Sequence, residues 1–233
     1  MTSKKTRIKS SEPHLPIREE VLETLKDAIL SGELLPGDRI VETQWAKKLG
    51  ISQSPVRDAL RILESMGLVH TVPYQGTYVS QIKIQDLFDA HTIRGDIESL
   101  AVHYAINRIT DDDLVKMQTL LAEMEEAGKH NELNRYVHLD TEFHKTIVAT
   151  SQNKLLIRLF EQLNVYEWTY FGTRFSSMDL VSLAERHESI YNALAARDEE
   201  KAREVVILHL QELIEIMRKN LAERIPINSL ISK

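Results

Sequence analysis

The chain has 233 residues, 42% of them hydrophobic and 27% charged, which is enough for two modest domains that each bury a core. It contains no cysteine, so disulfides and thiolate metal sites are excluded. The net charge of −6 is unevenly spread: residues 1–81 carry 11 Lys and Arg against 10 Asp and Glu, whereas residues 82–233 carry 18 against 25. Phosphates respond to local charge, so the acidic total does not exclude a nucleic-acid partner.

The first residues show no sign of a folded element. Residues 1–14 are rich in Ser and Lys and have no apolar periodicity, so we predict a disordered tail. The segment also lacks the apolar stretch of a secretory signal, and no run of 18 apolar residues exists that would span a membrane. We therefore expect a soluble, cytoplasmic protein without a membrane partner.

Residues 15–81 have the pattern of a winged helix-turn-helix domain. In chain order, the expected elements are a helix from Pro16 to a cap at Gly32, a short strand within 34–40, helices over about 42–49 and 54–66, and strands over 68–72 and 77–80. Helix, strand, helix, turn, helix and hairpin follow one another as in that motif. The hairpin is predicted from the turn residues Pro73 and Gly76.

The second helix of the helix-turn-helix begins with residues that can read DNA. A recognition helix places its N-terminal side chains against base edges in the major groove. Gln53 can pair bidentately with adenine, and Ser54 can bond a base edge or a phosphate. Arg57 and Arg61 are four residues apart, so they share one helix face and can reach guanine or phosphate. Gly76 at the wing tip lets the backbone approach DNA closely.

The same arginines have a simpler interpretation. Arg57 and Arg61 would then form an ordinary solvated surface, neutralised by Asp58 and Glu64. The neighbouring tight turn, polar helix N-terminus and predicted wing favour the DNA interpretation.

This region resembles the GntR family of bacterial regulators. The resemblance covers nearly all of residues 16–81 and rests on Glu42–Leu49, Gly50–Arg61, Leu63-Glu64, Gly67–Val69, Pro73 and Gly76. It implies DNA contacts at Ser52, Gln53, Ser54, Arg57 and Gly76. Many members have Arg where this chain has Thr43 and Gln53, so we expect its operator to differ at the bases that those positions read.

The remaining chain, residues 85–225, is predicted to be an all-α antiparallel helical bundle. Six helical stretches are expected, at about 85–107, 111–128, 132–150, 154–174, 179–196 and 198–223. Thr110 precedes three aspartates, which predicts a capped helix with an acidic first turn. The predicted fold class is thus mostly α, with a winged helix-turn-helix followed by a helical domain.

Four residues of the bundle have the spacing of a metal site. Asp140 and His144 are four apart on one helix, and His187 and His209 fall on the fifth and sixth helices. Bundles build metal sites from such a pair and single ligands on facing helices. Three imidazoles and a carboxylate suit Zn²⁺, Ni²⁺, Mn²⁺ or Fe²⁺ better than Ca²⁺. The alternative is that these histidines are unrelated, as lone histidines such as His91 usually are.

The bundle is similar to the FCD ligand-binding domain of the FadR subfamily within GntR. The resemblance rests on Asp140, His144, Asn153, Glu185–His187, Leu194–Asp198 and His209-Leu210. It implies a divalent metal held by an aspartate and three histidines, and six helices resemble the VanR-type branch. The family pairs through its C-terminal bundle, so a homodimer on a pseudo-palindromic double-stranded DNA operator is expected.

Arg94 and Glu98 lie four apart on the first helix of the bundle. They form either an intrahelical ion pair or a ligand site in which Arg94 holds the carboxylate of a small organic acid effector. The expected function is a DNA-binding transcription regulator controlled by such an effector at a metal-containing pocket. The alternatives are a metal-dependent enzyme domain fused to a DNA-binding module and a purely architectural DNA-binding protein.

Overall fold

A computed structural model describes residues 17–81, 83–176 and 178–224. The chain divides into two compact units, residues 1–83 and 84–233. The tail predicted over residues 1–14 lies outside the described residues.

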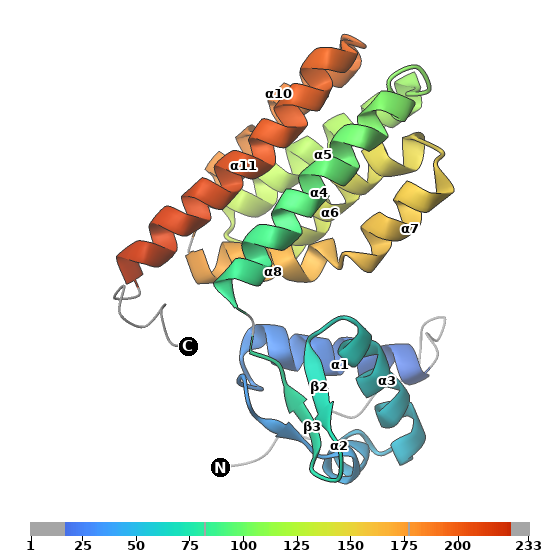
Figure 1. Cartoon of the computed structure of the whole chain (residues 1–233), viewed down its shortest axis with the longest axis vertical. Helices are drawn as coiled ribbons and strands as arrows, with labels where there is room; N and C mark the ends of the chain where they lie inside the picture. The colour runs from blue at the N-terminus through green and yellow to red at the C-terminus, as the bar shows by residue number, and fades with distance from the viewer. Residues whose placement is uncertain (1–16, 82, 177, 225–233) are drawn as a thin grey trace. The chain divides into compact units, whose positions relative to one another are not determined.

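The first unit is a winged helix-turn-helix, as predicted (Figure 1). Its elements are α1 (Ile17–Ser31), β1 (Arg39–Ile40), α2 (Glu42–Leu49), α3 (Gln53–Ser65), β2 (Val69–Val72) and β3 (Gly76–Val79). The strands form one antiparallel sheet in the order β1-β3-β2, with Ile40 opposite Thr77. Within 34–40 the chain turns at Gly37, whose φ is 89°, and then forms the short strand β1.

The turn between α2 and α3 depends on Gly50, whose φ of 74° lies in the left-handed region. The N–H groups of Gly50 and Ile51 both donate to the carbonyl of Ala46, which ends α2. The next helix, α3, begins at Gln53, one residue before the predicted start. Its apolar face is buried in the unit as its periodicity predicts, through Val56, Ala59, Leu60 and Leu63.

The second unit is all-helical in its described residues (Figure 1). Its helices are α4 (Ile84–Ala105), α5 (Asp111–Lys129), α6 (Leu133–Thr150), α7 (Lys154–Gln162), α8 (Val165–Ser176), α9 (Leu180–Glu185), α10 (Glu188–Ala195) and α11 (Glu199–Arg224). The predicted cap of α5 is confirmed: the Thr110 hydroxyl accepts from the Asp113 N–H, and the Asp113 carboxylate accepts from the Thr110 N–H. None of the described helices combines the length and apolarity needed to cross a bilayer.

Two of the six predicted helical stretches are interrupted, so the described part of this unit has eight helices. The stretch over 154–174 breaks between α7 and α8, where Asn164 has a φ of 52°. Asn adopts this left-handed conformation more readily than most residues. The stretch over 179–196 breaks between α9 and α10, where the His187 N–H bonds to the Ala184 carbonyl three residues back.

The central helix of the second unit is α6, which packs against α4, α5, α7, α8 and α9. The two longest helices of the unit, α4 and α11, pack along each other. The buried face of α6 mixes apolar side chains such as Phe143 and Ile147 with the polar side chains of Asp140 and His144. This helix therefore places two ionisable groups in the interior of the bundle.

Two helical glycines differ in the space beside them. At Gly128 on α5, an added Cβ would lie 2.9 Å from the backbone nitrogen of Val181 and 3.0 Å from the carbonyl carbon of Leu180. At Gly95 on α4, the nearest atom would be Cδ1 of Leu210 at 3.5 Å, an ordinary contact. The backbones of α5 and α9 thus meet so closely that only glycine fits at residue 128.

We expect Gly128→Ala to lower the free energy of unfolding by about 1–3 kcal/mol, because the methyl group would push two backbones apart. Gly95→Ala is the matched control and should be neutral or stabilising by up to about 1 kcal/mol, since alanine favours the helix. Chemical denaturation followed by circular dichroism measures both. Equal effects of the two substitutions would show that the α5–α9 contact does not constrain residue 128.

Candidate metal centre and DNA interface

The predicted DNA-reading residues lie together at the start of α3. Ser52 is the N-cap residue and its side chain makes no capping hydrogen bond. Ser52, Gln53, Ser54, Arg57 and Arg61 are all exposed, on the side of α3 that its buried apolar residues leave free. The sequence prediction that the two arginines project away from the core is therefore confirmed.

Arg57 is held by a residue that the sequence analysis did not single out. Its guanidinium donates to the Glu42 carboxylate of α2, with Nη2–Oε2 at 2.9 Å and Nε–Oε2 at 3.2 Å. This hydrogen bond and the Glu42 charge raise the pKa of Arg57. Arg61 lies 3.6 Å from Asp58, a looser contact. The partner of Arg57 is thus Glu42, not Asp58 or Glu64.

The wing has its own special backbone positions. Gly76 has a φ of 118°, and an added Cβ would lie 2.9 Å from Nε of Arg39, so this glycine makes room for an arginine side chain. Tyr74, at the tip, has a φ of 64° and a fully exposed ring. Arg39 places a further cation on the wing. The sequence offered no signal for it beyond one basic residue in a short strand.

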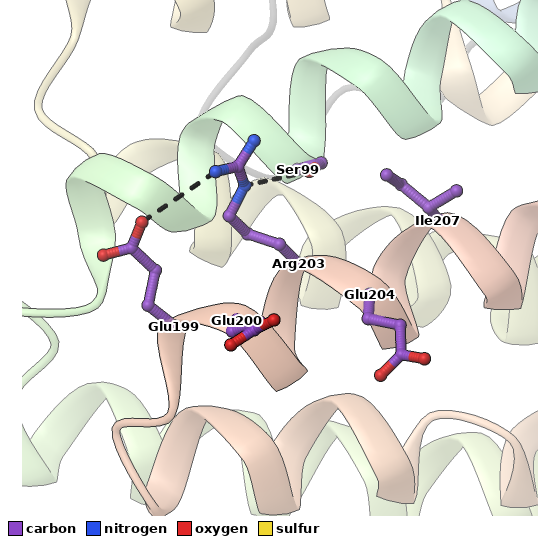
Figure 2. A pocket seen from close by; sticks show the side chains of 6 residues that line it. All are labelled: Ser99, Glu199, Glu200, Arg203, Glu204 and Ile207. Carbon is purple, nitrogen blue, oxygen red and sulfur yellow. Dashed lines mark hydrogen bonds and ion pairs between the residues drawn. The ribbon is translucent and has the colours of Figure 1, made fainter.

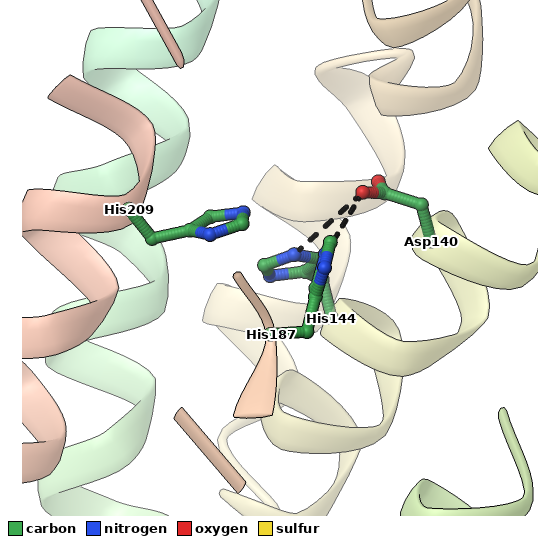
Figure 3. A group of neighbouring side chains, drawn as sticks. All are labelled: Asp140, His144, His187 and His209. Atoms are coloured by element: carbon green, nitrogen blue, oxygen red, sulfur yellow. Dashed lines mark hydrogen bonds and ion pairs between the residues drawn. The ribbon is translucent and has the colours of Figure 1, made fainter. Parts of the chain in front are cut away.

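The four predicted metal ligands meet in the second unit (Figure 3). Asp140, His144, His187 and His209 are all buried, and each offers one ligand atom within 4.8 Å of the others. Ligand atoms about 2 Å from a tetrahedral zinc ion lie about 3.3 Å from one another. The four side chains would therefore have to move closer together to close around such an ion.

The ligand residues come from three parts of the bundle. Asp140 and His144 lie one turn apart on α6, and His209 lies on α11. The sequence predicts His187 within a helix, but this residue lies in the break between α9 and α10. Arg186 ties this break to α11, because its Nη2 donates to the His209 carbonyl at 2.7 Å.

Two of the imidazoles have a buried nitrogen without a hydrogen-bond partner in the described residues, Nε2 of His144 and Nδ1 of His209. His187 lies 3.0 Å from the Leu183 carbonyl through Nδ1 and 3.0 Å from Asp140 Oδ1 through Nε2. A carbonyl only accepts, so Nδ1 carries a proton, and Nε2 and the carboxylate need a proton or a metal ion between them. These groups fit a divalent cation.

The protonation states also suit a metal. Burial would raise the pKa of Asp140, but the Arg94 charge and the hydrogen bond to His187 hold that pKa well below its usual value. Burial lowers the pKa of His144, and the Arg94 charge adds to this effect. Burial and the neighbouring His187 hold the pKa of His209 well below its usual value. Ionised carboxylates and neutral imidazoles are the forms that bind metals.

Arg94 lies beside these ligands and forms the intrahelical ion pair with Glu98 that was one of the two alternatives expected for it. Its guanidinium is 2% exposed and donates to Glu98 at 2.7 Å, to Asp140 at 3.2 Å and to the Thr169 hydroxyl at 3.0 Å. The Glu98 contact is an intrahelical ion pair, but it is buried rather than solvated. A guanidinium has about five N–H donors. The contacts within the described residues use three of them.

Two neighbours of Arg94 were not predicted. Thr169 accepts a hydrogen bond from it, and His91, one turn earlier on α4, is buried with no hydrogen-bond partner for Nε2 among the described residues. Burial and the Arg94 charge lower the pKa of His91 to about 4, so it is neutral. His91, Arg94, Trp168 and Thr169 line a gap between α4 and α8 that is too narrow to hold a water molecule. The spacing of His91, Arg94 and Glu98 on one helix face was the available signal.

A larger surface groove of 330 Å³ lies elsewhere (Figure 2). Its lining comes from α4 and α11 and consists of Ser99, Glu199, Glu200, Arg203, Glu204 and Ile207. Arg203 crosses it and donates to the Ser99 hydroxyl at 3.4 Å. The groove is acidic, because three carboxylates surround one guanidinium, and it would therefore repel an organic acid.

Both units match known families. Residues 17–79 match the bacterial regulatory proteins of the gntR family, and residues 89–212 match the FCD domain. The transcriptional regulator YdhC of Bacillus subtilis is 30% identical over 201 residues, which cover 85% of this chain and 90% of that protein. The transcriptional repressor RspR of Escherichia coli is 26% identical over 211 residues, which cover 89% and 91%.

Solved structures agree with these relatives. Escherichia coli McbR/YncC superposes with a TM-score of 0.72 at 26% identity, over 88% of this chain and 99% of that one. The metal-free FCD domain of TM0439 shares the fold of the second unit, with a TM-score of 0.52 at 18% identity over 62% and 99%. The relatives are named as transcription regulators, which sets aside the enzyme alternative. The chain belongs to the GntR family of bacterial regulatory proteins, in its FadR-type branch with a C-terminal FCD domain, and is a DNA-binding transcription regulator.

Proposed function

We propose that this regulator binds a pseudo-palindromic operator as a cytoplasmic homodimer, and that a small organic acid bound at a metal ion in the second unit controls this binding. The carrying observation is the buried group of Asp140, His144, His187 and His209, which leaves imidazole nitrogens unpartnered next to the Arg94 guanidinium. Such groups are costly to bury unless something binds them.

The metal would be held by the Asp140 carboxylate and one nitrogen from each histidine. Three nitrogens and one oxygen suit Zn²⁺, Ni²⁺, Mn²⁺ or Fe²⁺. These ions accept five or six ligands in many sites, so four protein ligands leave room for a further donor. When bound, the ion supplies a Lewis acid that coordinates a carboxylate.

Arg94 is the residue that would hold the far end of the acid. Its charge lies within 3.2 Å of the ligand Asp140, and two of its N–H groups stay available beyond the contacts described above. It also borders the gap between α4 and α8, together with the Thr169 hydroxyl, and the side chains there would have to move apart to admit an acid. A carboxylate that bridges the metal and Arg94 would be recognised by two positive charges.

The effector signal would reach the DNA-binding unit through α4. This helix carries Arg94 and Glu98 and begins at Ile84, directly after the winged unit in the chain. An effector regulates only if it binds more tightly to one arrangement of the protein than to another. A shift of α4 on binding would alter the spacing of two winged units on their half-sites. Relatives named as repressors favour repression.

The dimer contact is proposed to form on α4. Ile93, Leu100 and Tyr104 of this helix are large apolar residues that stay exposed in one chain, at spacings of seven and four residues. Residues at this spacing form a stripe on one helix face. A second copy that packs its own stripe there would cover them and place two reading helices on one operator.

For the dimer, we expect wild type to sediment as a dimer at micromolar concentration and Leu100→Glu to sediment as a monomer, because the charge would be buried in the interface. Val115→Glu is the matched control: Val115 is also exposed and apolar, but lies on α5. A monomeric wild type, or a Leu100→Glu variant as dimeric as Val115→Glu, would contradict the proposed interface.

For DNA reading, we expect Arg57→Ala to weaken binding to a site selected from a random-sequence library by at least about tenfold, since one phosphate or guanine contact is lost. Gln53→Ala should lose about 1–3 kcal/mol of discrimination at one base pair. Fluorescence anisotropy on the selected site and its single-base variants measures both. Lys116→Ala on α5 is the control, because it removes an exposed charge from the second unit. A Gln53→Ala profile identical to wild type would show that Gln53 reads no base.

For the metal, we expect His209→Ala and His187→Ala to purify without the bound ion that wild type retains and to lose the response of DNA binding to acids. His130→Ala is the control, because His130 is exposed and is not one of the four cluster residues. Metal content by mass spectrometry and operator affinity with a panel of small carboxylic acids are the measurements. A full acid response in both cluster variants would remove the metal from the proposal.

A further inference from the structure

One buried carboxylate beside the metal cluster has contacts that a simple ion pair does not explain. Glu98 is completely buried, and its two oxygens face two different groups. Oε1 accepts from Nε of Arg94 at 2.7 Å, and Oε2 accepts from Nδ1 of His144 at 2.5 Å. Glu98 therefore connects the proposed effector arginine on α4 with a proposed metal ligand on α6.

The contact fixes which nitrogen of His144 is available. An ionised carboxylate can only accept hydrogen bonds, so the proton of a neutral His144 ring must lie on Nδ1. The lone pair then lies on Nε2, which is the buried nitrogen without a hydrogen-bond partner in the described residues. If the proton were on Nε2 instead, the lone pair of Nδ1 would face a lone pair of the Glu98 carboxylate. The nitrogen that faces the cluster, Nε2, would then have no lone pair with which to bind a metal.

The same pair of residues also orients a second ligand. Arg94, which donates to Glu98, donates through Nη2 to Oδ2 of Asp140 at 3.2 Å. The other oxygen of Asp140, Oδ1, faces His187. The buried Arg94–Glu98 pair on α4 thus holds both Asp140 and His144 of α6. It contacts each of them through the atom that would not bind the metal, Oδ2 of Asp140 and Nδ1 of His144.

We propose that Glu98 is a positioning residue of the metal centre, which fixes the tautomer and ring orientation of His144 and links this ligand to Arg94. The inference rests on the proposed metal site. A carboxylate that accepts from the second nitrogen of a ligating histidine raises the affinity of that histidine for metal. Any movement of Arg94 toward an effector acid would reach His144 through this carboxylate and would reach Asp140 directly.

The test compares Glu98→Gln with wild type in the full-length protein. Glutamine keeps the volume but offers one acceptor oxygen, so its NH₂ group must face either the Arg94 or the His144 donor. We expect the Kd for Zn²⁺, measured by competition with a chromogenic chelator, to rise about 10–100-fold. Asp96→Asn is the matched control, because it neutralises an exposed carboxylate on the same helix.

A second measurement needs no variant and excludes a merely structural role. In ¹⁵N NMR spectra of the zinc-loaded wild type, His144 should show a protonated Nδ1 and a metal-bound Nε2. Metal binding through Nδ1 would overturn the inference, even if Glu98→Gln fails to fold.

The outcomes separate the inference from the function on which it rests. A wild type that binds no Zn²⁺ overturns both the metal centre and the role of Glu98. A wild type that binds Zn²⁺, with Glu98→Gln binding it equally well, overturns the role of Glu98 alone. Weaker binding in Glu98→Gln, with wild-type affinity in Asp96→Asn and Nδ1 protonated in His144, supports it.

Discussion

The second unit depends on the burial of one guanidinium. Moving the Arg94 charge out of water costs several kcal/mol, and only well-placed carboxylates and hydrogen bonds offset that cost. Glu98 supplies one carboxylate from the same helix, Asp140 supplies another from α6, and Thr169 adds a hydroxyl from α8. Three helices are thereby fixed relative to one another. A well-packed apolar replacement of such a cluster is often more stable, so its presence is better explained by binding than by stability.

The two carboxylates of this cluster outnumber its one guanidinium. Glu98 and Asp140 are both ionised, so a proton or a metal ion between His187 and Asp140 must offset the remaining negative charge. Burial keeps His144 and His209 in their neutral forms, so those rings provide lone pairs rather than positive charge. A cation held by these rings would offset the excess charge. The electrostatics and the unpartnered nitrogens therefore support the same class of ligand by separate arguments.

Sequence patterns predicted most of the fold because its elements are locally determined. The periodicity of α3, the cap at Thr110 and the left-handed Gly50 each need only neighbouring residues, and all are present. The breaks at Asn164 and His187 were missed, because no Gly or Pro marks them and packing decides them. The metal residues were found from spacing on α6 and the family resemblance.

What sequence spacing could not give was the partner of each charged group. Arg94 and Glu98 looked like an intrahelical pair, but their contacts to Thr169 and His144 join residues 75 and 46 positions apart. Glu42 and Arg57 are 15 positions apart and meet only because α2 and α3 pack together. Long-range pairs of this kind follow from the packing of helices, and helical periodicity carries no information on them.

The Glu42–Arg57 pair has a consequence for how the protein responds to ionic strength. A free arginine that docks on a phosphate releases a condensed counterion from the DNA, which steepens the salt dependence of binding. Arg57 is already neutralised by Glu42. On DNA, the phosphate must therefore either displace Glu42 from Arg57 or bind Arg57 with the negative Glu42 carboxylate still close by. Salt weakens the Glu42–Arg57 pair, which frees Arg57 for DNA, and it also weakens the contact of Arg57 with phosphate. These two effects on DNA binding oppose each other. Arg57 should therefore orient the protein on DNA more than it adds affinity through counterion release. DNA binding should persist over a wider range of salt concentration than the number of basic residues implies.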